Sequence, residues 1–172
     1  MMRRTDKKHL VIPDTQVRPG VPSDHFKALG NYIVEKRPDV VVHIGDHWDM
    51  PSLSSYAEKD STFSSTNYQH DIDAGNEALA LMLKPIEAHN KKHRSPLDIR
   101  MVFLVGNHED RITRLINSAH YARFRGVITQ RDFELSSWEV HPFLKIVPID
   151  GIHYSHYFRS KGSQRALGGT AQ

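Results

Sequence analysis

Three polar clusters in the chain each follow a short apolar run. The clusters are Asp14-Thr15-Gln16, Gly45-Asp46-His47-Trp48-Asp49 and Gly106-Asn107-His108-Glu109. The runs before them (10–12, 40–44 and 101–105) are mostly β-branched or bulky and lack polar alternation, which is typical of parallel strands buried on both faces. Ligands of open α/β sheets collect beyond the carboxyl ends of the strands. If the three strands are neighbours, Asp14, Asp46 and Asn107 converge on a hard, oxygen-rich metal site.

The segment between the first two runs predicts a crossover helix. Apolar residues recur at helical spacing from Phe26 to Ile33, with Ser23 as the expected N-cap and a stop before Pro38. A helix between two parallel strands forms a βαβ unit, whose crossover is right-handed.

A longer connection separates the second and third runs. Residues 51–70 are rich in Ser, Thr and Asn and predict a long loop. Helical spacing returns over 71–92, with an interruption expected at Pro85. After the third run, a further helix is expected to begin at Glu109 or Asp110.

The last third of the chain changes character. Apolar residues in 140–149 lead to Asp150-Gly151 and then to 152–157, and Asp-Gly between apolar runs predicts a tight hairpin. The parallel half is therefore expected to pass into an antiparallel half. Residues 159–172 contain several glycines and no periodicity, so a poorly ordered loop is expected there. We interpret 1–172 as a single domain.

Composition indicates an ordinary globular protein. The 172 residues are 38% hydrophobic, with a mean hydropathy of -0.53, and no apolar stretch is long enough to span a membrane. The absence of cysteine excludes disulfides and thiolate metal sites and fits a cytoplasmic protein. A net charge of +3 permits a phosphate-bearing partner but is too small to demonstrate nucleic-acid binding, and oligomeric state is not indicated.

The clusters resemble, in order, the motifs of the calcineurin-like metallophosphoesterases. The matching elements are Asp14-x-Gln16, Gly45-Asp46-x-x-Asp49, Gly106-Asn107-His108-Glu109 and a later His156 that follows a strand. The resemblance covers residues 9–157 and is greatest to phage- and bacterium-encoded members, which would act in the host cytoplasm. It implies an α/β fold of the metallo-dependent phosphatase type, with two packed sheets flanked by helices (α/β/β/α).

The resemblance also implies a dinuclear metal centre. Asp14 and Gln16 would bind the first metal, Asn107 and His156 would bind the second, and Asp46 would bridge the two. Two divalent ions would activate a water molecule and clamp the phosphate. Mn²⁺ is the expected ion, with Fe, Zn or Ni as alternatives.

Three further residues receive roles from the same resemblance. His108 would protonate the leaving group. Asp49 would orient either a ligand or His108. Arg111 lies in the first turn of the expected helix, from which it could reach a substrate phosphate.

One family element is absent from the sequence. Members normally end in Gly-His-x-His or a close variant, yet no histidine follows His156. The Gln16 amide, where the family usually has histidine, is a poorer donor for transition metals. The chain could be a truncated piece, its ligands could come from elsewhere, or hydrolysis could be lost. We favour truncation, with an incomplete C-terminal edge and weak metal binding. A second ion would bind weakly or not at all, and the site of Asn107 and His156 is expected to be the fuller one because it retains an imidazole.

The same residues also have structural interpretations. Asp14, Asp46 and Asn107 could be turn residues, and His156 could be a hydrogen-bonded strand histidine. His43 is expected to be a satisfied core histidine. His47 could be a substitute ligand, but it is expected either to be exposed to solvent or to lie beside the site. The five arginines of 111–131 could form a solvated helix face.

These observations predict a metal-dependent phosphoester hydrolase. We lean toward a phosphodiesterase or nuclease acting on DNA or a nucleotide, because Met50-Pro51 stands where protein phosphatases carry Arg-Gly. The main rival is a non-catalytic phosphoesterase-like scaffold that binds a protein or nucleic acid. Retention of His108 counts against the scaffold, and the missing histidines count for it. A nucleic-acid-binding domain without catalysis would need a denser basic surface.

Overall fold

A four-stranded parallel sheet forms the centre of the protein, in a computed structural model that describes residues 7–54, 66–160, 162, 166 and 167. The strands lie in chain order and are β1 (His9–Ile12), β2 (Val40–His43), β3 (Arg100–Leu104) and β4 (Glu139–His141). All three neighbouring pairs are parallel, so the carboxyl ends of the strands share one edge. The first three strands are the three predicted from the apolar runs.

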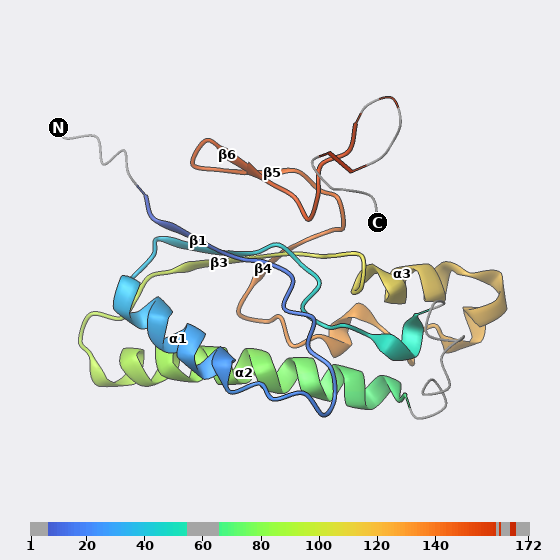
Figure 1. Ribbon diagram of the computed structural model, residues 1–172, viewed down its shortest axis with the longest axis horizontal. Coiled ribbons are helices and arrows are strands. Elements are labelled where there is room, and N and C mark those ends of the chain that lie inside the picture. The colour runs from blue at the N-terminus through green and yellow to red at the C-terminus, as the bar shows by residue number, and fades with distance from the viewer. Residues whose placement is uncertain (1–6, 55–65, 161, 163–165, 168–172) are drawn as a thin grey trace.

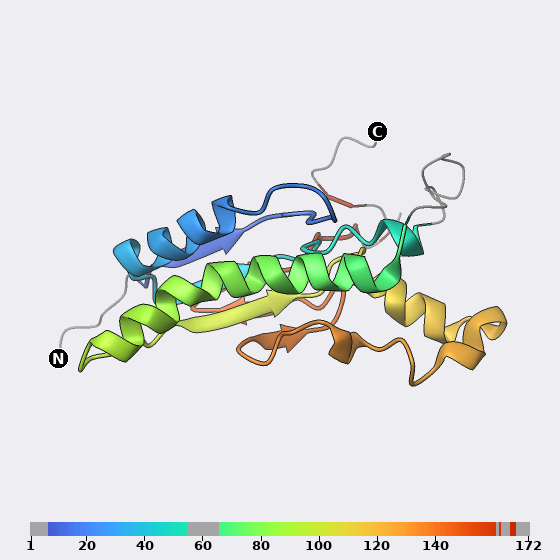
Figure 2. The ribbon, with the colours of Figure 1, turned by 90° about the horizontal axis from the view of Figure 1, so that it is seen from below.

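Helices and a hairpin cover opposite faces of this sheet. Helices α1 (His25–Lys36) and α2 (Tyr68–Lys92) lie together on one face, and a hairpin of β5 (Val147–Ile149) and β6 (Ile152–Tyr154) lies over the other (Figure 1). Helix α3 (Asp110–Asn117) follows β3 and extends past the end of the sheet (Figure 2). Short 3-10 helices are η1 (Pro51–Leu53), η4 (Ala119–Phe124) and η5 (Gln130–Asp132). The predicted α/β class, with a second sheet, is confirmed.

Alternate residues of the central strands pack on opposite faces. Val41 and Phe103 belong to the core cluster that faces the helices. Val42 and Val102 belong to a second cluster, which includes residues of the hairpin. All four side chains are fully buried, which explains why the strands lack polar alternation.

The fourth strand differs from the sequence prediction. The apolar segment 140–149 is expected to open the antiparallel half, but its first residues belong to β4, which pairs in parallel with β3. Val140 is 45% exposed, because β4 lies at the edge of the sheet. The segment Glu139–His141 therefore lacks the apolar run that identifies the other three strands.

The helical boundaries contain two further corrections. Helix α1 begins at His25, so its N-cap is Asp24 and not Ser23, and the Asp24 side chain makes no capping hydrogen bond. Helix α2 continues through Pro85, where an interruption is expected from the sequence. Helix α1 crosses there so closely that a Cβ at Gly30 would lie 2.2 Å from the Met82 carbonyl oxygen. This packing offsets the hydrogen bond that Pro85 cannot donate.

The start of α2 shortens the predicted loop. Asn67 caps the helix by accepting from the Gln69 and His70 amides, so α2 begins at Tyr68. Residues 55–65 of the predicted loop lie outside the described residues. Helix α3 begins at Asp110, as predicted.

The hairpin has the predicted Asp-Gly turn. Asp150 and Gly151 have φ values of 50° and 86°, which is the left-handed pair of a tight two-residue turn. In the tail, Leu167 donates its amide to the Phe158 carbonyl, and most of the predicted loop 159–172 lies outside the described residues. No helix of the described part of the chain is long and apolar enough to cross a lipid bilayer.

Candidate metal centre

The carboxyl ends of β1, β2 and β3 bring the three polar clusters together. We call the loops that follow β1, β2 and β3 the first, second and third loops. The backbone amide of Gln16 donates to the Asp46 carbonyl at 2.9 Å, and that of Val17 donates to the His47 carbonyl at 2.6 Å, so the first two loops run side by side. One ligand atom each from Asp14, Asp46 and His156 lies within 4.8 Å of the other two. Three predicted metal ligands, far apart in sequence, therefore share one site.

Two glycines permit this close approach. Gly45 has a φ of 96°, and a Cβ there would lie 2.4 Å from the Gly106 backbone nitrogen. A Cβ at Gly106 would lie 2.1 Å from Asp46 Oδ1. Any side chain at either position would force the second and third loops apart and displace Asp46.

The carboxylate of Glu109 links the second and third loops by accepting hydrogen bonds from both, a role that the sequence analysis missed. Its Oε2 accepts from the amides of Asp46 (2.9 Å) and Gly106 (2.8 Å), and its Oε1 accepts from His47 (2.7 Å) and Trp48 (3.1 Å). The side chain is fully buried. Burial, followed by the charge of Asp46, raises the pKa of Glu109 above its usual value, although the backbone donors oppose this. The sequence signal for this role of Glu109 is its position in the third polar cluster.

His156 and Asn107 provide the test of whether a cation fits here. His156 Nδ1 lies 2.7 Å from the Ile44 carbonyl oxygen, which can only accept, so Nδ1 carries a proton. His156 Nε2 lies 2.9 Å from Asn107 Oδ1 and 3.6 Å from Asp46 Oδ2. An imidazole nitrogen, an amide oxygen and carboxylate oxygens therefore converge, and this set of donor atoms fits a divalent metal.

A chain of hydrogen bonds through two buried histidines fixes the first loop. The Gly45 amide donates to His43 Nδ1 (3.1 Å), so in a neutral ring the proton is on Nε2. This nitrogen then donates to Thr15 Oγ1 (3.2 Å). Thr15 then donates to His47 Nδ1 (2.7 Å), and His47 Nε2 donates to the Gly75 carbonyl (3.0 Å). Burial lowers the pKa of His47 to about 4 and that of His43 well below its usual value. His43 is thus the satisfied core histidine expected. His47 lies beside the site and is fully buried, so the alternative of a solvent-exposed histidine is wrong.

His108 lies between two carboxylates at the edge of this centre. Its Nδ1 is 3.2 Å from Asp49 Oδ1, and its Nε2 is 3.7 Å from Asp46 Oδ2. Burial lowers the pKa of His108, but the pairing with Asp49 and the charge of Asp46 outweigh burial and raise it. Asp49 also pairs with Arg18 Nη2 at 2.9 Å. Asp49 therefore contacts His108, as one of its two expected roles requires.

Two arginines of α3 contact the loops through backbone carbonyls. Arg111 Nη1 donates to the carbonyls of Asp49 (2.6 Å) and Met50 (3.0 Å), and Arg114 Nη2 donates to that of Asn107 (2.8 Å). Arg111 thus stabilises the second loop through its backbone carbonyls. Its contact with a substrate phosphate stays a prediction. Gln16, whose φ is 43°, is placed by its backbone bond to Asp46 and is exposed, and its role as a ligand also stays a prediction.

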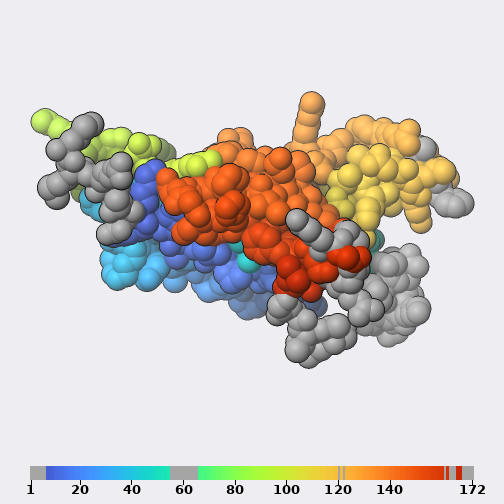
Figure 3. Space-filling model, turned by 90° about the horizontal axis from the view of Figure 1, so that it is seen from above, coloured from blue at the N-terminus to red at the C-terminus, as the bar shows by residue number. Residues whose placement is uncertain are grey.

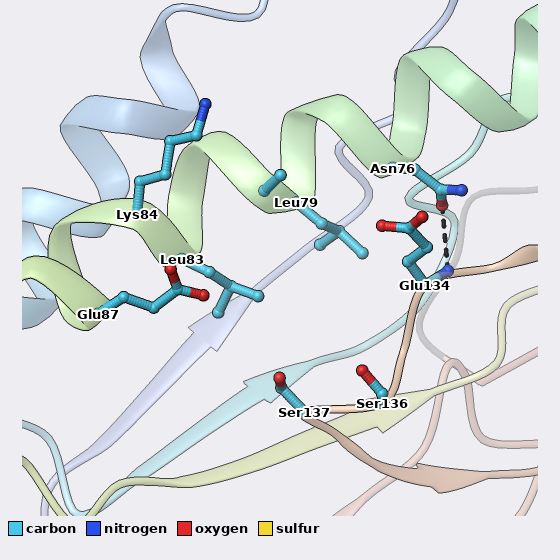
Figure 4. Close-up of a pocket in the computed structure, with 9 residues that line it drawn as sticks. Asn76, Leu79, Leu83, Lys84, Glu87, Glu134, Ser136 and Ser137 are labelled. Atoms are coloured by element: carbon cyan, nitrogen blue, oxygen red, sulfur yellow. Dashed lines mark hydrogen bonds between the residues drawn. The ribbon is translucent and has the colours of Figure 1, made fainter.

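A pocket of about 230 Å³ lies elsewhere, between α2 and residues 134–137 (Figure 4). Asn76 accepts there from the Glu134 amide, and Lys84, Glu87 and Ser137 are among the other lining residues. None of the predicted site residues lines it. The chemistry predicted from the sequence therefore belongs to the strand ends and not to this pocket.

Comparison with known proteins agrees with this geometry. Residues 8–166 match the family model described as calcineurin-like phosphoesterase. The "Gene 54 protein" of Mycobacterium phage D29 is 32% identical over 98 residues, which is 54% of this chain and 38% of the phage protein, so the matched part spans well under half of that relative. No solved structure matches significantly. The chain belongs to the calcineurin-like phosphoesterases, a family of metal-dependent phosphoester hydrolases.

Proposed function

We propose that this protein is a phosphodiesterase with a dinuclear metal centre that takes Mn²⁺. The observation that carries the proposal is the convergence of His156 Nε2, Asn107 Oδ1 and Asp46 Oδ2, with Asp14 within reach of the same point. An imidazole nitrogen beside carboxylate and amide oxygens is a set of donor atoms that suits a divalent cation.

The ligand assignment follows the positions of these side chains. Asp46 is central, since its Oδ2 faces both His156 and His108, and Asp14 reaches it from the end of β1. Asp46 would bridge two ions, with Asp14 and Gln16 on one side and Asn107 and His156 on the other. When bound, divalent ions supply Lewis acidity toward the phosphate and lower the pKa of water.

The protein's own residues position the substrate and deliver a proton. His108 is held by Asp49 at its Nδ1, so its Nε2 faces the centre and can protonate the leaving oxygen. Asp49 is in turn fixed by Arg18 and by the backbone contact of Arg111. These contacts keep the proposed acid in one orientation.

The proposed substrate is a phosphodiester in a nucleic acid or nucleotide. Met50, which stands where protein phosphatases carry arginine, is fully buried and has a φ of 50°. Its side chain therefore supplies no charge for a phosphoprotein. The basic segment that follows the third cluster, Arg111 and Arg114 onward, suits a polyanionic substrate.

The test measures metal content and hydrolysis together. The protein is stripped with EDTA, reloaded with Mn²⁺, and assayed with bis-p-nitrophenyl phosphate and with p-nitrophenyl phosphate. We expect Mn²⁺-dependent hydrolysis that favours the diester. Asp46→Asn should lose both metal and activity, because two cations lose their anionic bridge.

Three outcomes would contradict parts of this proposal. Wild-type metal content in Asp46→Asn would exclude Asp46 as the bridge. A preference for the monoester would exclude the phosphodiesterase assignment. A wild-type protein that binds almost no Mn²⁺, Fe²⁺ or Zn²⁺ would support the non-catalytic scaffold instead.

A further inference from the structure

The segment from α3 to η5, Asp110–Asp132, concentrates the positive charge of the protein. It contains five arginines and two aspartates, a net charge of +3, which equals the net charge of the whole chain. The remaining residues are therefore neutral overall. The mild total charge conceals a local basic segment, which we call the α3–η5 arm.

The arm extends away from the rest of the protein. In Figure 2 the yellow and orange ribbon of α3 and η4 continues past the ends of the sheet and of α2. The space-filling view from above shows the same residues at one end of the molecule (Figure 3). Because the arm begins directly after His108 and Glu109, it leads outward from the metal centre.

Most of the arginine charge on the arm is not neutralised by the contacts that the structure describes. Arg114 and Arg125 donate to backbone carbonyls, which carry no net charge, whereas Arg111 also lies near the carboxylates of Asp49 and Asp46. Arg114 also pairs with Asp110 Oδ2 at 3.4 Å, and Arg123 stacks over the Phe124 ring at 5.2 Å. Four of the five arginines are exposed, namely Arg114, Arg123, Arg125 and Arg131. The exposed guanidinium groups keep their positive field toward solvent.

Aromatic rings accompany these charges. Tyr121 is 41% exposed, and its ring stacks with that of Phe124 at a centroid distance of 6.2 Å and an interplanar angle of 29°. With Arg123 over Phe124, the tip of the arm presents rings and guanidinium planes side by side. Exposed rings beside arginines form the surface on which unpaired bases stack, while a duplex offers its bases only at groove edges.

We propose that the α3–η5 arm binds single-stranded nucleic acid and leads its backbone to the metal centre. The arginines contact the phosphates, and Tyr121 stacks on a base. The inference rests on the proposed phosphodiesterase function and supplies its class of substrate, a single-stranded polynucleotide.

Binding is tested separately from hydrolysis. Fluorescence anisotropy in EDTA follows an oligothymidylate of about 20 nucleotides, which exceeds the length that one such surface occupies. The arm variant is Arg123→Gln/Arg125→Gln/Arg131→Gln. The charge-matched control is Lys91→Gln/Lys92→Gln/Arg94→Gln, which changes three exposed basic residues at and just beyond the C-terminal end of α2.

The arm variant should lower the slope of log K against log salt by about 2, because each phosphate that an arginine neutralises on a single strand contributes about 0.7. The control variant should retain the wild-type slope. Tyr121→Ala should weaken binding by roughly fivefold or more at constant slope, because a stacked ring contributes about 1 kcal/mol or more. Thermal unfolding identifies any variant that has lost its fold. Tyr121→Phe is the matched control for Tyr121→Ala: it keeps the aromatic ring and should retain binding.

Hydrolysis of bis-p-nitrophenyl phosphate separates this proposal from the proposed function. The arm variants should hydrolyse this small diester at the wild-type rate while losing activity on the oligonucleotide. If the wild-type protein lacks diesterase activity, the proposed function fails while binding in EDTA still tests the arm. Equal losses in the arm and control variants, or tighter binding of a duplex of the same length, would overturn the proposal.

Discussion

Glu109 Oε2 accepts a hydrogen bond from the backbone amide of Asp46 at 2.9 Å, across a sequence separation of 63 residues. The same carboxylate accepts three more backbone amides from the second and third loops. The placement of the proposed bridging aspartate therefore depends on a buried acid whose own oxygens are occupied by backbone donors. A change at Glu109 should affect both folding and metal binding.

Glu109→Gln should destabilise the protein and weaken metal binding. The glutamine amide would turn two N–H groups toward amides that are themselves donors, and each unsatisfied buried donor costs about 1–3 kcal/mol. We expect a loss of about 2 kcal/mol or more in the free energy of unfolding, measured with urea in EDTA. Glu77→Gln, at an exposed position of α2, is the control and should change stability by less than about 0.5 kcal/mol. Equal stability of the two variants would refute this role of Glu109.

His108→Ala should separate substrates by their leaving groups. Turnover of a dinucleotide with an alkoxide leaving group should fall by roughly 10²–10⁴-fold, the usual contribution of a general acid. Bis-p-nitrophenyl phosphate should lose far less, because nitrophenolate departs without a proton. Metal content, measured by mass spectrometry, should be unchanged. Equal losses on both substrates would rule out the proton donor role.

Loss of His156 should reduce metal affinity more than loss of Gln16. His156 places an imidazole nitrogen beside Asn107 and Asp46, whereas Gln16 offers only an exposed amide. We expect His156→Ala to raise the Kd for Mn²⁺ by at least about tenfold, and Gln16→Ala to raise it less. Titration calorimetry measures both the Kd and the number of ions. His153→Ala, an exposed residue of the same hairpin, is the control, and a larger effect of Gln16→Ala would reverse the proposed order of the two sites.

The buried histidines predict that stability falls in mild acid. The pKa of His47 is lowered to about 4, so the unfolded chain binds a proton below pH 6.5 that the folded protein does not. The stabilisation from the neutral ring is complete above pH 6.5 and is lost as pH falls toward 4, by up to about 3 kcal/mol. Burial also lowers the pKa of His43, so His43 contributes to the loss of stability in the same direction.

Urea unfolding between about pH 7.5 and 4.5 measures this loss of stability. The range covers the usual histidine pKa and extends toward the lowered one, and EDTA removes any contribution from metal release. Nitrogen-15 spectra of the imidazoles should show both rings neutral, with the proton on Nε2, as the contacts to Thr15 and Gly75 require. His153→Gln, which replaces an exposed histidine, should leave the curve unchanged. A flat stability curve across this range would contradict the role of the buried rings.

Local sequence is sufficient to identify the strands that carry the site. Buried strands need apolar side chains on both faces, so β2 and β3 are visible as uninterrupted runs. The edge strand β1, in which Val11 is 43% exposed, is still visible because its residues 10–12 are all apolar. The residues directly after these three strands are then the candidates for the carboxyl edge. The Asp150-Gly151 turn is also predictable, because a tight hairpin needs positive φ at both positions.

Elements that depend on long-range packing are missed or misplaced by the sequence pattern. The edge strand β4 buries too little to show a pattern, and its parallel pairing is decided by β3. Pro85 stays inside α2 because α1 packs against the helix at Gly30, which is far from it in the chain. Local propensity contains no information on such contacts.

For the site, the sequence by itself determined which residue types stand at the strand ends, and only the tertiary structure decided how they are held. Five candidates could be selected from their order along the chain, namely Asp14, Asp46, Asn107, His108 and His156. The role of Glu109 and the orientation of the His156 ring required the partners to be known, because a hydrogen bond is identified only when both of its ends are. The same holds for Arg111, whose carbonyl contacts on the second loop arise from folding and have no signature in local sequence.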